Sequence, residues 1–496
     1  MGWYCVLTRG GVKSCKIRAC IIARGGAKFA LLFYAQRYNP CMASESILEG
    51  TICALATPPG TGGVGVIRVS GPEAFVVVDR VTWRPNHTPC AAYAGYTLHR
   101  ADVVQASGEV IDDVLLAVFH APRSYTGENV VEISAHGGPV PIRQILGRLL
   151  GAGARMARPG EFTQRAFLNG KMDLAQAEAV GDLIAARTEE AHRLARRQSD
   201  GHLSRAVGGI RDTALGVLAR IEATIDFPED VGELDTEACL ADLSGAERAV
   251  SALLATADAG ILYREGLKVV LVGRPNVGKS SLLNALLRTD RAIVTAVPGT
   301  TRDTLEETLS LRGIPVRAVD TAGLRDTEDA VEQMGVARSR AALADADVVL
   351  LVLDAEDGET AEDAALRAEL TDTRHLVVWN KWDRMPGRDL PEGGIAVSAA
   401  TGWNLAALED ALADLALSGH SADTEDTFVT HARHREALTA ARAHLADAAA
   451  SLSAALPADF ASIDLRGALD ALGEITGETA PEDMIHEIFS RFCIGK

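Results

Sequence analysis

Residues 273–280 read Gly-Arg-Pro-Asn-Val-Gly-Lys-Ser, which is the pattern G-x-x-x-x-G-K-S. The pattern follows an apolar stretch, Leu267–Val272, and precedes an amphipathic one, Ser281–Leu287, so it connects a predicted strand to a predicted helix. Glycines in such a loop let backbone N–H groups wrap phosphates at a helix N-terminus. Lys279 would neutralise the β and γ phosphates, and the Ser280 hydroxyl would ligate Mg²⁺. We therefore expect a nucleoside triphosphate site on an α/β domain.

Polar turns end three further apolar stretches of the same domain. Asp320-Thr-Ala-Gly323 supplies a carboxylate that reaches Mg²⁺ through water and a glycine N–H that senses the γ-phosphate. In Asn380-Lys-Trp-Asp383, the Asp383 carboxylate can accept from the N1–H and 2-amino groups of guanine, which adenine cannot satisfy. Ser398-Ala399 offers a backbone N–H to guanine O6. An ATPase would lack the N-K-x-D element, so the four motifs together resemble the translation-factor class of P-loop GTPases.

The switch residues show one departure from that class. Thr300-Thr-Arg-Asp303 has the spacing of a switch segment with a threonine on Mg²⁺, and we assign this role to Thr301. Leu324 stands where many GTPases carry a glutamine that orients the attacking water. An acid further along has to replace it, and the candidates, each otherwise a solvated surface acid, are Glu328, Asp329 and Glu332.

Composition and charge narrow the classes of function for this chain of 496 residues. Hydrophobic residues make up 47% and charged residues 23%, and no apolar run approaches the roughly 18 residues of a membrane span, which excludes a disordered or membrane-embedded chain. Residues 1–41 contain seven basic residues and no acid. The whole chain has a net charge of −18, so the residues after 41 carry a net charge of −25. A body this acidic repels phosphate backbones. Contact with RNA then requires a local basic patch or a partner.

The basic segment 1–41 has three interpretations. A signal peptide is disfavoured, because the apolar stretch 29–35 is short, flanked by basic residues and without a small-residue cleavage pattern. An organelle transit peptide fits the acid-free composition but not the single serine, Ser14. We favour a start at Met42, where ordinary composition begins, which would make residues 1–41 a non-native extension.

The cysteines point to a reducing compartment. Four of the eight lie in residues 1–41, the other four are spread over the rest of the chain, and no C-x-x-C pair occurs. This usage predicts a reduced, cytoplasmic protein with neither a disulfide framework nor a cysteine-type zinc site.

Hydrophobic patterns divide the chain after Met42 into three predicted domains. Short β-like runs and a helix predict an α+β domain over residues 42–165. Near-continuous apolar strands over residues 266–420 predict a buried parallel sheet. Residues 166–265 and 421–496 are helical in pattern. The fold class is therefore α/β and α, and we expect the two helical stretches to pack together around the inserted domain.

Within the first helical stretch, three sequence features predict interruptions. They are Gly201, Gly208-Gly209 and Phe227-Pro228. The same stretch concentrates basic residues in an otherwise acidic chain, and these either approach tRNA or form a solvated helix face, the reading we favour. They are Arg193, Arg196, Arg197, Arg205 and Arg211.

Motifs outside the nucleotide-binding domain identify the family that the chain resembles. They include Ala56-Thr-Pro-Pro-Gly60, His136-Gly-Gly-Pro139, Ala157-Arg-Pro-Gly-Glu-Phe162, Met172-Asp-Leu-Ala-Gln-Ala-Glu178 and the terminal Phe492-Cys-Ile-Gly-Lys496. With these motifs, the chain from about Ile52 to Lys496 resembles the MnmE (TrmE) family of tRNA-uridine modification GTPases. An ordinary ribosome GTPase of the Era or Der type would explain only the middle third.

The resemblance implies an N-terminal folate-binding domain that also holds a homodimer, and a helical domain interrupted by a Ras-like P-loop GTPase domain. It implies GTP hydrolysis that depends on K⁺ and on transient dimerisation of the GTPase domains. It also implies a heterotetramer with an FAD-dependent MnmG-type partner. Such proteins add an aminomethyl-type (carboxymethylaminomethyl) group to C5 of wobble uridine 34 in certain tRNAs, and the carbon comes from 5,10-methylene-tetrahydrofolate.

The resemblance also assigns roles to matching residues. Folate contacts fall on Arg68, Glu132, Lys171 and Lys496. This is reasonable chemistry, because the glutamate carboxylates of a folate suit basic side chains and its 2-amino-pterin edge suits a carboxylate. The implied K⁺ site consists of Asn276, Thr295, Val297 and Thr300. Glu332 would orient the hydrolytic water, and Lys279 is the second catalytic residue; Cys493 is left without a role.

The full set of expected GTP contacts follows from the motifs and the resemblance together. It comprises Asn276, Val277, Gly278, Lys279, Ser280, Ser281, Thr295, Ala296, Val297, Pro298, Gly299, Thr300, Thr301, Asp320, Thr321, Ala322, Gly323, Asn380, Lys381, Asp383, Ser398 and Ala399. Two alternatives stand beside this interpretation. A ribosome-assembly or RNA-binding switch would be supported by a basic C-terminal domain with a G-x-x-G loop, which this sequence lacks. A folate-binding structural protein with a degenerate GTPase domain is opposed by the intact motifs.

Overall fold

The computed structural model describes residues 21–24, 27–30, 49–289, 307–320, 346–371, 373–385, 387–389, 393–417 and 427–496. For residues 21–24, 27–30, 288–289, 307–308 and 319–320 it describes the backbone alone. The chain divides into two units, Met1–Glu49 and Gly50–Lys496. In the first unit, strands β1 (Ile21–Arg24) and β2 (Ala27–Ala30) pair antiparallel. The second unit contains all the predicted site residues.

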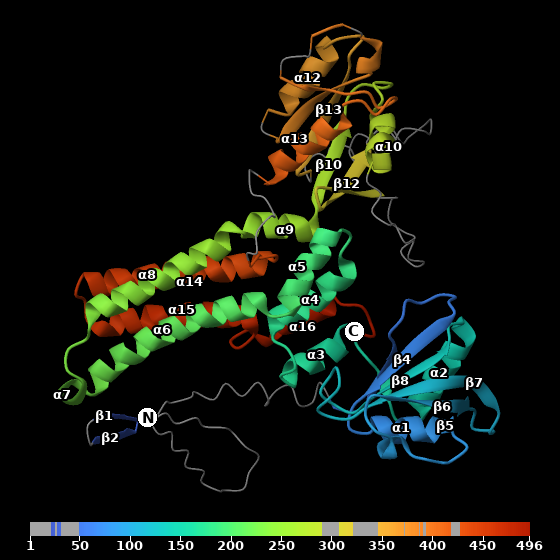
Figure 1. The fold of residues 1–496 in the computed structure, drawn as a ribbon, viewed down its shortest axis with the longest axis vertical. Coiled ribbons are helices and arrows are strands. Elements are labelled where there is room, and N and C mark those ends of the chain that lie inside the picture. Colours follow the sequence, from blue (N-terminus) through green and yellow to red (C-terminus); the bar gives the residue numbers. More distant parts are fainter. Residues whose placement is uncertain are drawn as a thin grey trace. The chain divides into compact units, whose positions relative to one another are not determined.

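The N-terminal part of the second unit is a seven-stranded sheet with two helices packed against it (Figure 1). The strand order is β5-β6-β7-β8-β4-β3-β9, and neighbouring strands are antiparallel except β3 with β9. Alternate residues of β4, such as Ile67 and Val69, are buried in the core beneath the helices, so Arg68 between them faces the other side of the sheet. The elements are β3 (Ile52–Leu55), β4 (Val64–Ser70), α1 (Ala74–Val81), β5 (Thr82–Trp83), β6 (Thr97–Val104), β7 (Val110–Phe119), β8 (Val130–His136), α2 (Pro139–Gly151) and β9 (Arg155–Met156).

Two helical stretches, far apart in the sequence, share one hydrophobic core. Helix α14 packs against α8 and α15, and α15 packs against α6. The predicted pairing of the two helical stretches is therefore observed. Among the described residues, no helix is long and apolar enough to cross a membrane. The helices are α3 (Glu161–Leu168), α4 (Leu174–Ala185), α5 (Glu189–Ser199), α6 (His202–Asp226), α7 (Pro228–Val231), α8 (Thr236–Ala255), α9 (Ala257–Glu265), α14 (Ala432–Ser453), α15 (Ala458–Thr476) and α16 (Glu482–Ser490).

Between these stretches lies a six-stranded sheet in the order β11-β12-β10-β13-β14-β15. All neighbouring pairs are parallel except β11 with β12, an edge pairing that the sequence patterns do not predict. Strand β10 has β12 on one side and β13 on the other, so the loop after β10 opens at a switch point of the sheet, where ligands bind in such folds. The elements are β10 (Leu267–Val272), α10 (Lys279–Thr289), β11 (Glu307–Leu311), β12 (Ile314–Asp320), β13 (Val348–Asp354), α12 (Ala361–Glu369), β14 (His375–Asn380), β15 (Ile395–Ala396) and α13 (Leu405–Leu417). The predicted domain limits stay predictions.

One predicted helix interruption is wrong. The breaks at Gly201 and Phe227-Pro228 are present, but Gly208-Gly209 lies inside α6, which continues to Asp226. Val207 and Ile210 flank the glycine pair and are buried in the helical core. Packing of this apolar face outweighs the cost of about 1 kcal/mol that each glycine imposes on a helix.

Candidate functional site

The phosphate-binding loop is held by hydrogen bonds from its own lysine, Lys279. The Lys279 amine donates to the carbonyl oxygens of Gly273 and Arg274, each at 2.8 Å, so the loop curls around this side chain. Helix α10 begins at Lys279 and directs its first free N–H groups into the same loop. Loop and helix start together provide the donors that a triphosphate requires. Ser280 follows at the start of this helix, where its hydroxyl suits the predicted Mg²⁺ role.

Asn380 connects the phosphate loop to the base-binding side. Its buried side chain donates from Nδ2 to the Val277 carbonyl oxygen at 2.9 Å and accepts through Oδ1 from the Ala399 N–H at 3.1 Å. A Cβ atom on Gly278 would lie 2.4 Å from Asn380 Nδ2, and the φ of Gly278 is +94°, so only glycine fits here. The structure thereby joins three of the predicted motifs through one amide.

Asp383 is oriented for recognition by a neighbouring hydroxyl. Ser398 Oγ donates to Asp383 Oδ1 at 2.6 Å, which brings the last two motifs together at the carboxyl ends of β14 and β15. The predicted free N–H at Ser398-Ala399 is not observed: the Ser398 N–H donates to Trp403 O and the Ala399 N–H donates to Asn380. The reason is a tight bridge between Ser398 and Trp403, which the apolar pattern of the sequence does not reveal.

The remaining predicted nucleotide residues fall outside the part of the chain that the structure describes. For Asp320 the backbone ends β12 beside β10, as the motif requires, and the side chain is not described. Those outside the described residues are Thr295, Ala296, Val297, Pro298, Gly299, Thr300, Thr301, Thr321, Ala322, Gly323 and Glu332, together with Leu324, Glu328 and Asp329.

A second polar cluster lies on the N-terminal sheet. Arg68 and Glu132 are direct partners in the register of β4 with β8, and their side chains form an ion pair with N···O distances of 2.8 Å. The guanidinium also lies over the rings of Tyr125 and Phe162, with 5.2 and 5.6 Å to the ring centroids. The exposed fractions are 14% for the Arg68 side chain and 27% for Glu132, so both remain accessible to a ligand at one face.

The C-terminus of the chain lies against this pair. Arg68 donates to the Gly495 carbonyl oxygen at 3.3 Å, and the Phe162 N–H donates to the Lys496 carbonyl oxygen at 3.2 Å. Gly495 has a φ of +98°, and a Cβ there would lie 2.2 Å from the Leu55 carbonyl oxygen, so the approach requires glycine. Arg68, Glu132 and Lys496 are thus brought together from three distant parts of the sequence.

Burial and charge act on the Lys496 amine in this cluster. Burial and then the nearby Arg68 guanidinium lower the pKa of Lys496, and Glu132 partly offsets both effects. The cluster therefore combines two cationic groups and one carboxylate at a partly open surface, the donor set expected for a ligand with acidic groups at one end and amino hydrogens at the other.

Comparison with known proteins matches most of the chain to one family. Residues 51–171 match the family model "GTP-binding protein TrmE N-terminus", and residues 174–493 match "MnmE helical domain". The chain is 47% identical over 464 residues to the tRNA modification GTPase MnmE of Moorella thermoacetica, covering 91% of this chain and 100% of that protein. It is 45% identical over 462 residues to the protein of the same name from Desulforamulus reducens, again covering 91% and 100%.

The chain belongs to the MnmE family. It is thus a member of a family of tRNA modification GTPases, and its architecture combines a TrmE-type N-terminal domain, a helical domain and a Ras-like P-loop domain. Among solved structures, the chain is similar to the G domain of the T. maritima FeoB iron transporter, with 27% identity, a TM-score of 0.22 and coverage of 30% of this chain and 98% of that one.

Lys171, the fourth residue that the MnmE resemblance assigns to folate, is not in the Arg68 cluster. Its amine is exposed and donates to the Pro122 carbonyl oxygen at 3.1 Å. It lines a separate open groove of about 380 Å³, together with Phe167, Asp173, Gln176 and Glu478. The Pro122 carbonyl oxygen that binds Lys171 lies three residues before Tyr125, whose ring contacts the Arg68 guanidinium.

The structure adds residues that the sequence analysis of this MnmE-family chain missed. Asp354 ends β13 and accepts from the Lys381 amine at 2.6 Å, which fixes the lysine of the N-K-x-D motif. Arg274 in the phosphate loop is held by the buried Asp363 at 3.0 Å. A carboxylate at the end of an apolar strand is the one signal that would have identified Asp354. Cys493, which the sequence analysis leaves without a role, is exposed.

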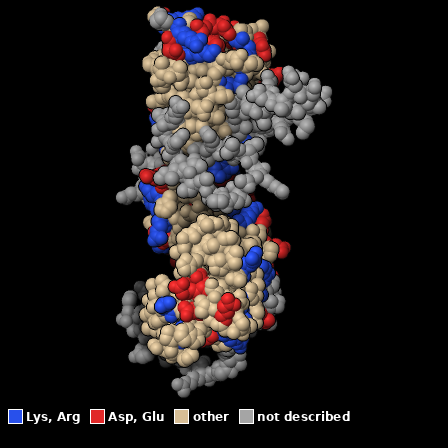
Figure 2. Space-filling model, turned by 90° about the vertical axis from the view of Figure 1, so that its right-hand side faces the viewer, with Lys and Arg blue, Asp and Glu red and all other residues tan. Residues whose placement is uncertain are grey.

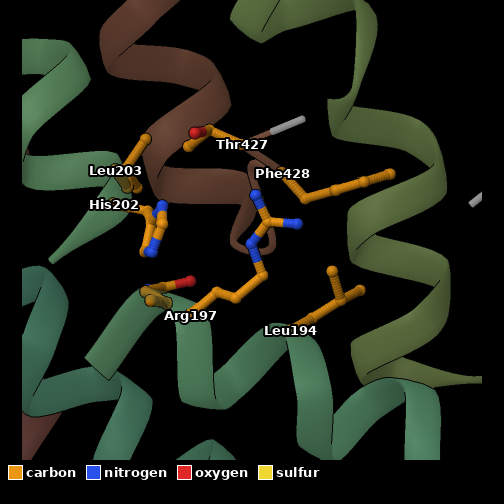
Figure 3. A pocket seen from close by; sticks show the side chains of 7 residues that line it. Leu194, Arg197, His202, Leu203, Thr427 and Phe428 are labelled. Atoms are coloured by element: carbon orange, nitrogen blue, oxygen red, sulfur yellow. The ribbon is translucent and has the colours of Figure 1, made fainter. Parts of the chain in front are cut away.

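A small cavity lies where the chain re-enters the helical domain. Thr427 and Phe428 line it on one side, and Leu194, Arg197 and His202 of α5 and α6 line the other (Figure 3). Its volume of about 10 Å³ suffices for a single water and excludes a nucleotide or a folate. Arg197, one of the basic residues considered for tRNA, is therefore directed into the domain and away from a flat surface.

Three of the other basic residues form ion pairs, and Arg205 donates to the Asp200 carbonyl oxygen at 2.8 Å. Arg193 pairs with Glu190, Arg196 with Asp200 at 3.0 Å and Arg211 with Glu478 at 2.7 Å. Figure 2 shows a face on which Lys and Arg are interspersed with Asp and Glu among wide uncharged areas. These observations favour a solvated helix face over a phosphate-binding stripe.

Proposed function

We propose that this chain is a GTP hydrolase that acts in tRNA modification, as the names of its MnmE relatives state for those proteins. The finer proposal is that it installs a carboxymethylaminomethyl-type group at C5 of wobble uridine 34, together with an FAD-dependent MnmG-type partner. The observation that carries the finer proposal is the convergence of Arg68, Glu132 and Lys496 on one open surface.

The nucleotide side of the proposal depends on how the described residues position GTP. Asp383, oriented by Ser398, accepts from the guanine N1–H and 2-amino groups, and Asn380 holds the phosphate loop at the correct distance from this carboxylate. Lys279, with the amide groups at the start of α10, binds the phosphates. A preformed arrangement of donors stabilises the charge that develops on the phosphates during hydrolysis.

Two metal ions belong to the proposal. Ser280 and Thr301 would hold Mg²⁺, and Asn276, Thr295, Val297 and Thr300 would hold K⁺, which supplies positive charge at the phosphates when it is bound. Among these residues the structure describes Ser280 and Asn276, and both are exposed beside the phosphate loop, as metal ligands in this place must be. Glu332 would orient the attacking water in place of the glutamine that Leu324 replaces.

The folate side of the proposal depends on matched charges. Arg68 and Lys496 suit the carboxylates of 5,10-methylene-tetrahydrofolate, which supplies one carbon, and Glu132 suits the amino hydrogens of its pterin. Lys171 would also contact the ligand. A homodimer through the N-terminal domains and a heterotetramer with the partner complete the proposal. We place the protein in the cytoplasm, where an exposed free thiol such as Cys493 stays reduced.

Mass spectrometry of wobble uridines tests the function. Cells that lack this protein should lose the modified nucleoside, and the wild-type gene should restore it. Glu132→Ala should fail to restore it and should weaken binding of reduced folate in calorimetry, while GTP affinity stays unchanged. An unchanged nucleoside profile in the deletion strain would contradict the proposed function. Undiminished folate affinity in Glu132→Ala and in a chain lacking Phe492 to Lys496 would contradict the placement of the pocket.

A further inference from the structure

The second residue of the phosphate loop, Arg274, is held by two carboxylates from another part of the chain. Its Nε donates to both oxygens of the Asp363 carboxylate, at 3.0 and 3.2 Å, and its Nη2 donates to Asp357 at 3.1 Å. The two acids follow β13, 83 and 89 residues after Arg274. The pattern G-x-x-x-x-G-K-S leaves the identity of its second residue open, so the motif does not reveal these contacts.

Asp363 is a buried partner that two elements bind at once. Its side chain is 0% exposed, and Oδ2 accepts from the Thr360 N–H at 3.1 Å and from the Thr360 hydroxyl at 2.7 Å. Thr360 is the N-cap residue of α12, so these bonds are part of the capping box that begins the helix. A buried carboxylate is costly without a cation beside it, and Arg274 supplies this cation.

The ion pair attaches one arm of the phosphate loop to the start of α12. The adjacent Gly273 is also fixed, because its φ is +145° and a Cβ there would lie 2.2 Å from the Val352 carbonyl oxygen of β13. Asn380 holds the opposite arm by donating to the Val277 carbonyl oxygen at 2.9 Å. The loop is therefore fixed at both arms, and Arg274 and Asp363 hold the arm that the N-K-x-D motif does not reach.

The backbone of the same arm holds the lysine of the loop. The Lys279 amine donates to the carbonyl oxygens of Gly273 and Arg274, each at 2.8 Å, and the Lys279 side chain is buried. The positions of these two oxygens therefore determine where the amine lies. Because this amine neutralises the β and γ phosphates, a shift of the Arg274 backbone would move positive charge away from the reacting phosphates.

We propose that Asp363 is a positioning residue for GTP hydrolysis, which acts through Arg274 on the carbonyl oxygens that place the Lys279 amine. The inference rests on the hydrolase activity in the proposed function. A misplacement of about 1 Å can slow a reaction by up to about 100-fold. Binding of the ground state is less sensitive to such a shift, because a looser loop can still close on the phosphates. The pair should therefore act on the rate of hydrolysis more than on nucleotide affinity.

The geometry opposes a direct role of Arg274 on the nucleotide. A guanidinium that stabilises a transferring phosphoryl group has to present its N–H donors to that group. The Nε and Nη2 of Arg274 are instead directed at Asp363 and Asp357. A guanidinium that turned to a phosphate would leave the buried Asp363 carboxylate without its cation, which is unfavourable.

The experiment measures single-turnover GTP hydrolysis and nucleotide affinity of the full-length chain. Arg274→Gln removes the cation, and Asp363→Asn removes the buried charge but keeps an oxygen that can accept from Thr360. The double variant removes both charges. The matched control is Arg312→Gln, which breaks an ion pair with Asp410 on the same domain, at the turn between β11 and β12. Thermal melting monitored by circular dichroism reports on the folding of each variant.

Both single variants should slow hydrolysis by at least about tenfold, while the Kd for GTP and for GDP changes by less than about threefold. The double variant should remain at least about tenfold slower than the wild type and should be no slower than Arg274→Gln, because both substitutions break one contact. It leaves no unpaired charge between the two positions, so it keeps the test valid if Arg274→Gln melts early. Arg312→Gln should hydrolyse GTP within about twofold of the wild-type rate.

Three results would overturn the proposal. Wild-type rates in all the variants would do so and would leave the proposed function intact, whereas a wild-type chain that does not hydrolyse GTP would contradict both. Slow hydrolysis in Arg274→Gln with a wild-type rate in Asp363→Asn would mean that the arginine acts directly on the nucleotide. A loss of GTP and GDP affinity equal to the loss of rate would make the pair a structural support of the domain without a positioning role.

Discussion

At the scale of single residues, the Asp383 carboxylate combines a predicted role with an unpredicted partner. Asp383 follows from the N-K-x-D motif, whereas the Ser398 hydroxyl that donates to it at 2.6 Å is visible only in the fold. Because this bond holds Asp383 Oδ1, the orientation of the carboxylate is set before any nucleotide arrives. Preorganisation of this kind reduces the ordering cost of binding.

Asp383→Asn should convert a guanine site into one that prefers xanthine nucleotides, because the 2-oxo group of xanthine needs a donor. Loss of charged hydrogen bonds to guanine should cost about 1.5–3 kcal/mol, or roughly 10- to 150-fold in GTP affinity. Competition of GTP, XTP and ATP against a fluorescent nucleotide measures the change. Equal competition by ATP in the wild type would contradict the assigned role of Asp383.

The exposed Asn276 gives a second test at this scale. Its φ of +64° places it in the left-handed region, so the phosphate loop turns sharply at this residue. If its side chain holds K⁺, GTP hydrolysis should be at least about tenfold faster in K⁺ than in Na⁺ at equal ionic strength, since a cation replaces a missing charge stabiliser. Asn276→Ala should abolish the difference. Equal rates in the two cations would remove K⁺ from the mechanism.

Glu332→Ala tests the water-orienting role at a position outside the described residues. GTP affinity should stay the same and single-turnover hydrolysis should slow by about 100-fold or more, the usual effect of removing a general base or water-positioning group. The matched control is Glu328→Ala, which removes a neighbouring acid. A loss of GTP binding in Glu332→Ala would indicate a structural role.

At the scale of elements, helix α6 shows how packing outweighs local propensity. The 25-residue helix runs through Gly208 and Gly209, where the sequence predicts an interruption. A Cβ at either position would meet no atom within 4 Å outside the local helix backbone. The two glycines therefore lower the stability of the helix, and packing of its buried face offsets this loss. No close contact at either position requires a glycine.

Gly208→Ala and Gly209→Ala should each stabilise the protein by about 0.5–1 kcal/mol, because alanine restricts the unfolded chain and fits the helix. Gly260→Ala in α9 is the contrasting control. A Cβ there would lie 2.3 Å from the Val429 carbonyl oxygen, so the substitution should destabilise. Chemical denaturation monitored by circular dichroism measures all three. Destabilisation in the α6 variants would contradict this prediction and would mean that α6 requires glycine at these positions.

At the scale of the whole molecule, a buried charge network connects the helical domain to both chain crossings of the nucleotide-binding domain. Glu178 of α4 contacts His434 at 2.8 Å and Arg433 at 2.7 Å, just after the chain re-enters the helical domain. Asp182 of the same helix contacts His431 at 2.8 Å and Arg264 at 2.7 Å, just before the chain leaves it. One helix thus holds both connections.

This network predicts a loss of stability in mild acid. Burial lowers the pKa of His434 to about 4 from its ordinary 6.5, so the unfolded chain binds this proton more readily than the folded one. Stability should be complete above pH 6.5 and should fall by up to roughly 3 kcal/mol as the pH drops towards 4. Burial alone would raise the pKa of Glu178, but the hydrogen bond from His434 and the charge of Arg433 outweigh this effect and lower it, which adds to the loss of stability at still lower pH.

Differential scanning calorimetry at several pH values between 7.5 and 4.5 checks this prediction. The wild type should lose stability steadily across the range below 6.5. His434→Gln removes the titrating ring, so its stability should depend less on pH over the same interval, whatever its absolute value at neutral pH. Parallel pH profiles for the two proteins would place the acid sensitivity elsewhere.

The sequence by itself determined the class of the fold, the phosphate loop, the N-K-x-D element and the family. These features depend on local order: strands and helices follow from the period of apolar residues, and a phosphate loop is built from consecutive backbone groups. The strand that precedes the loop, β10, has the ends that the apolar run Leu267–Val272 predicts.

Tertiary structure alone decided which distant residues share a site. Arg68 meets Glu132 because β4 and β8 pair in one register, and Lys496 joins them because Gly495 can approach the Leu55 carbonyl oxygen. Lys171 lies apart, and both N–H groups of Ser398-Ala399 are engaged, for the same kind of reason. The contact between Arg68 and Glu132 spans 64 residues and that between Arg68 and Gly495 spans 427, and local sequence periodicity carries no information about contacts at such separations.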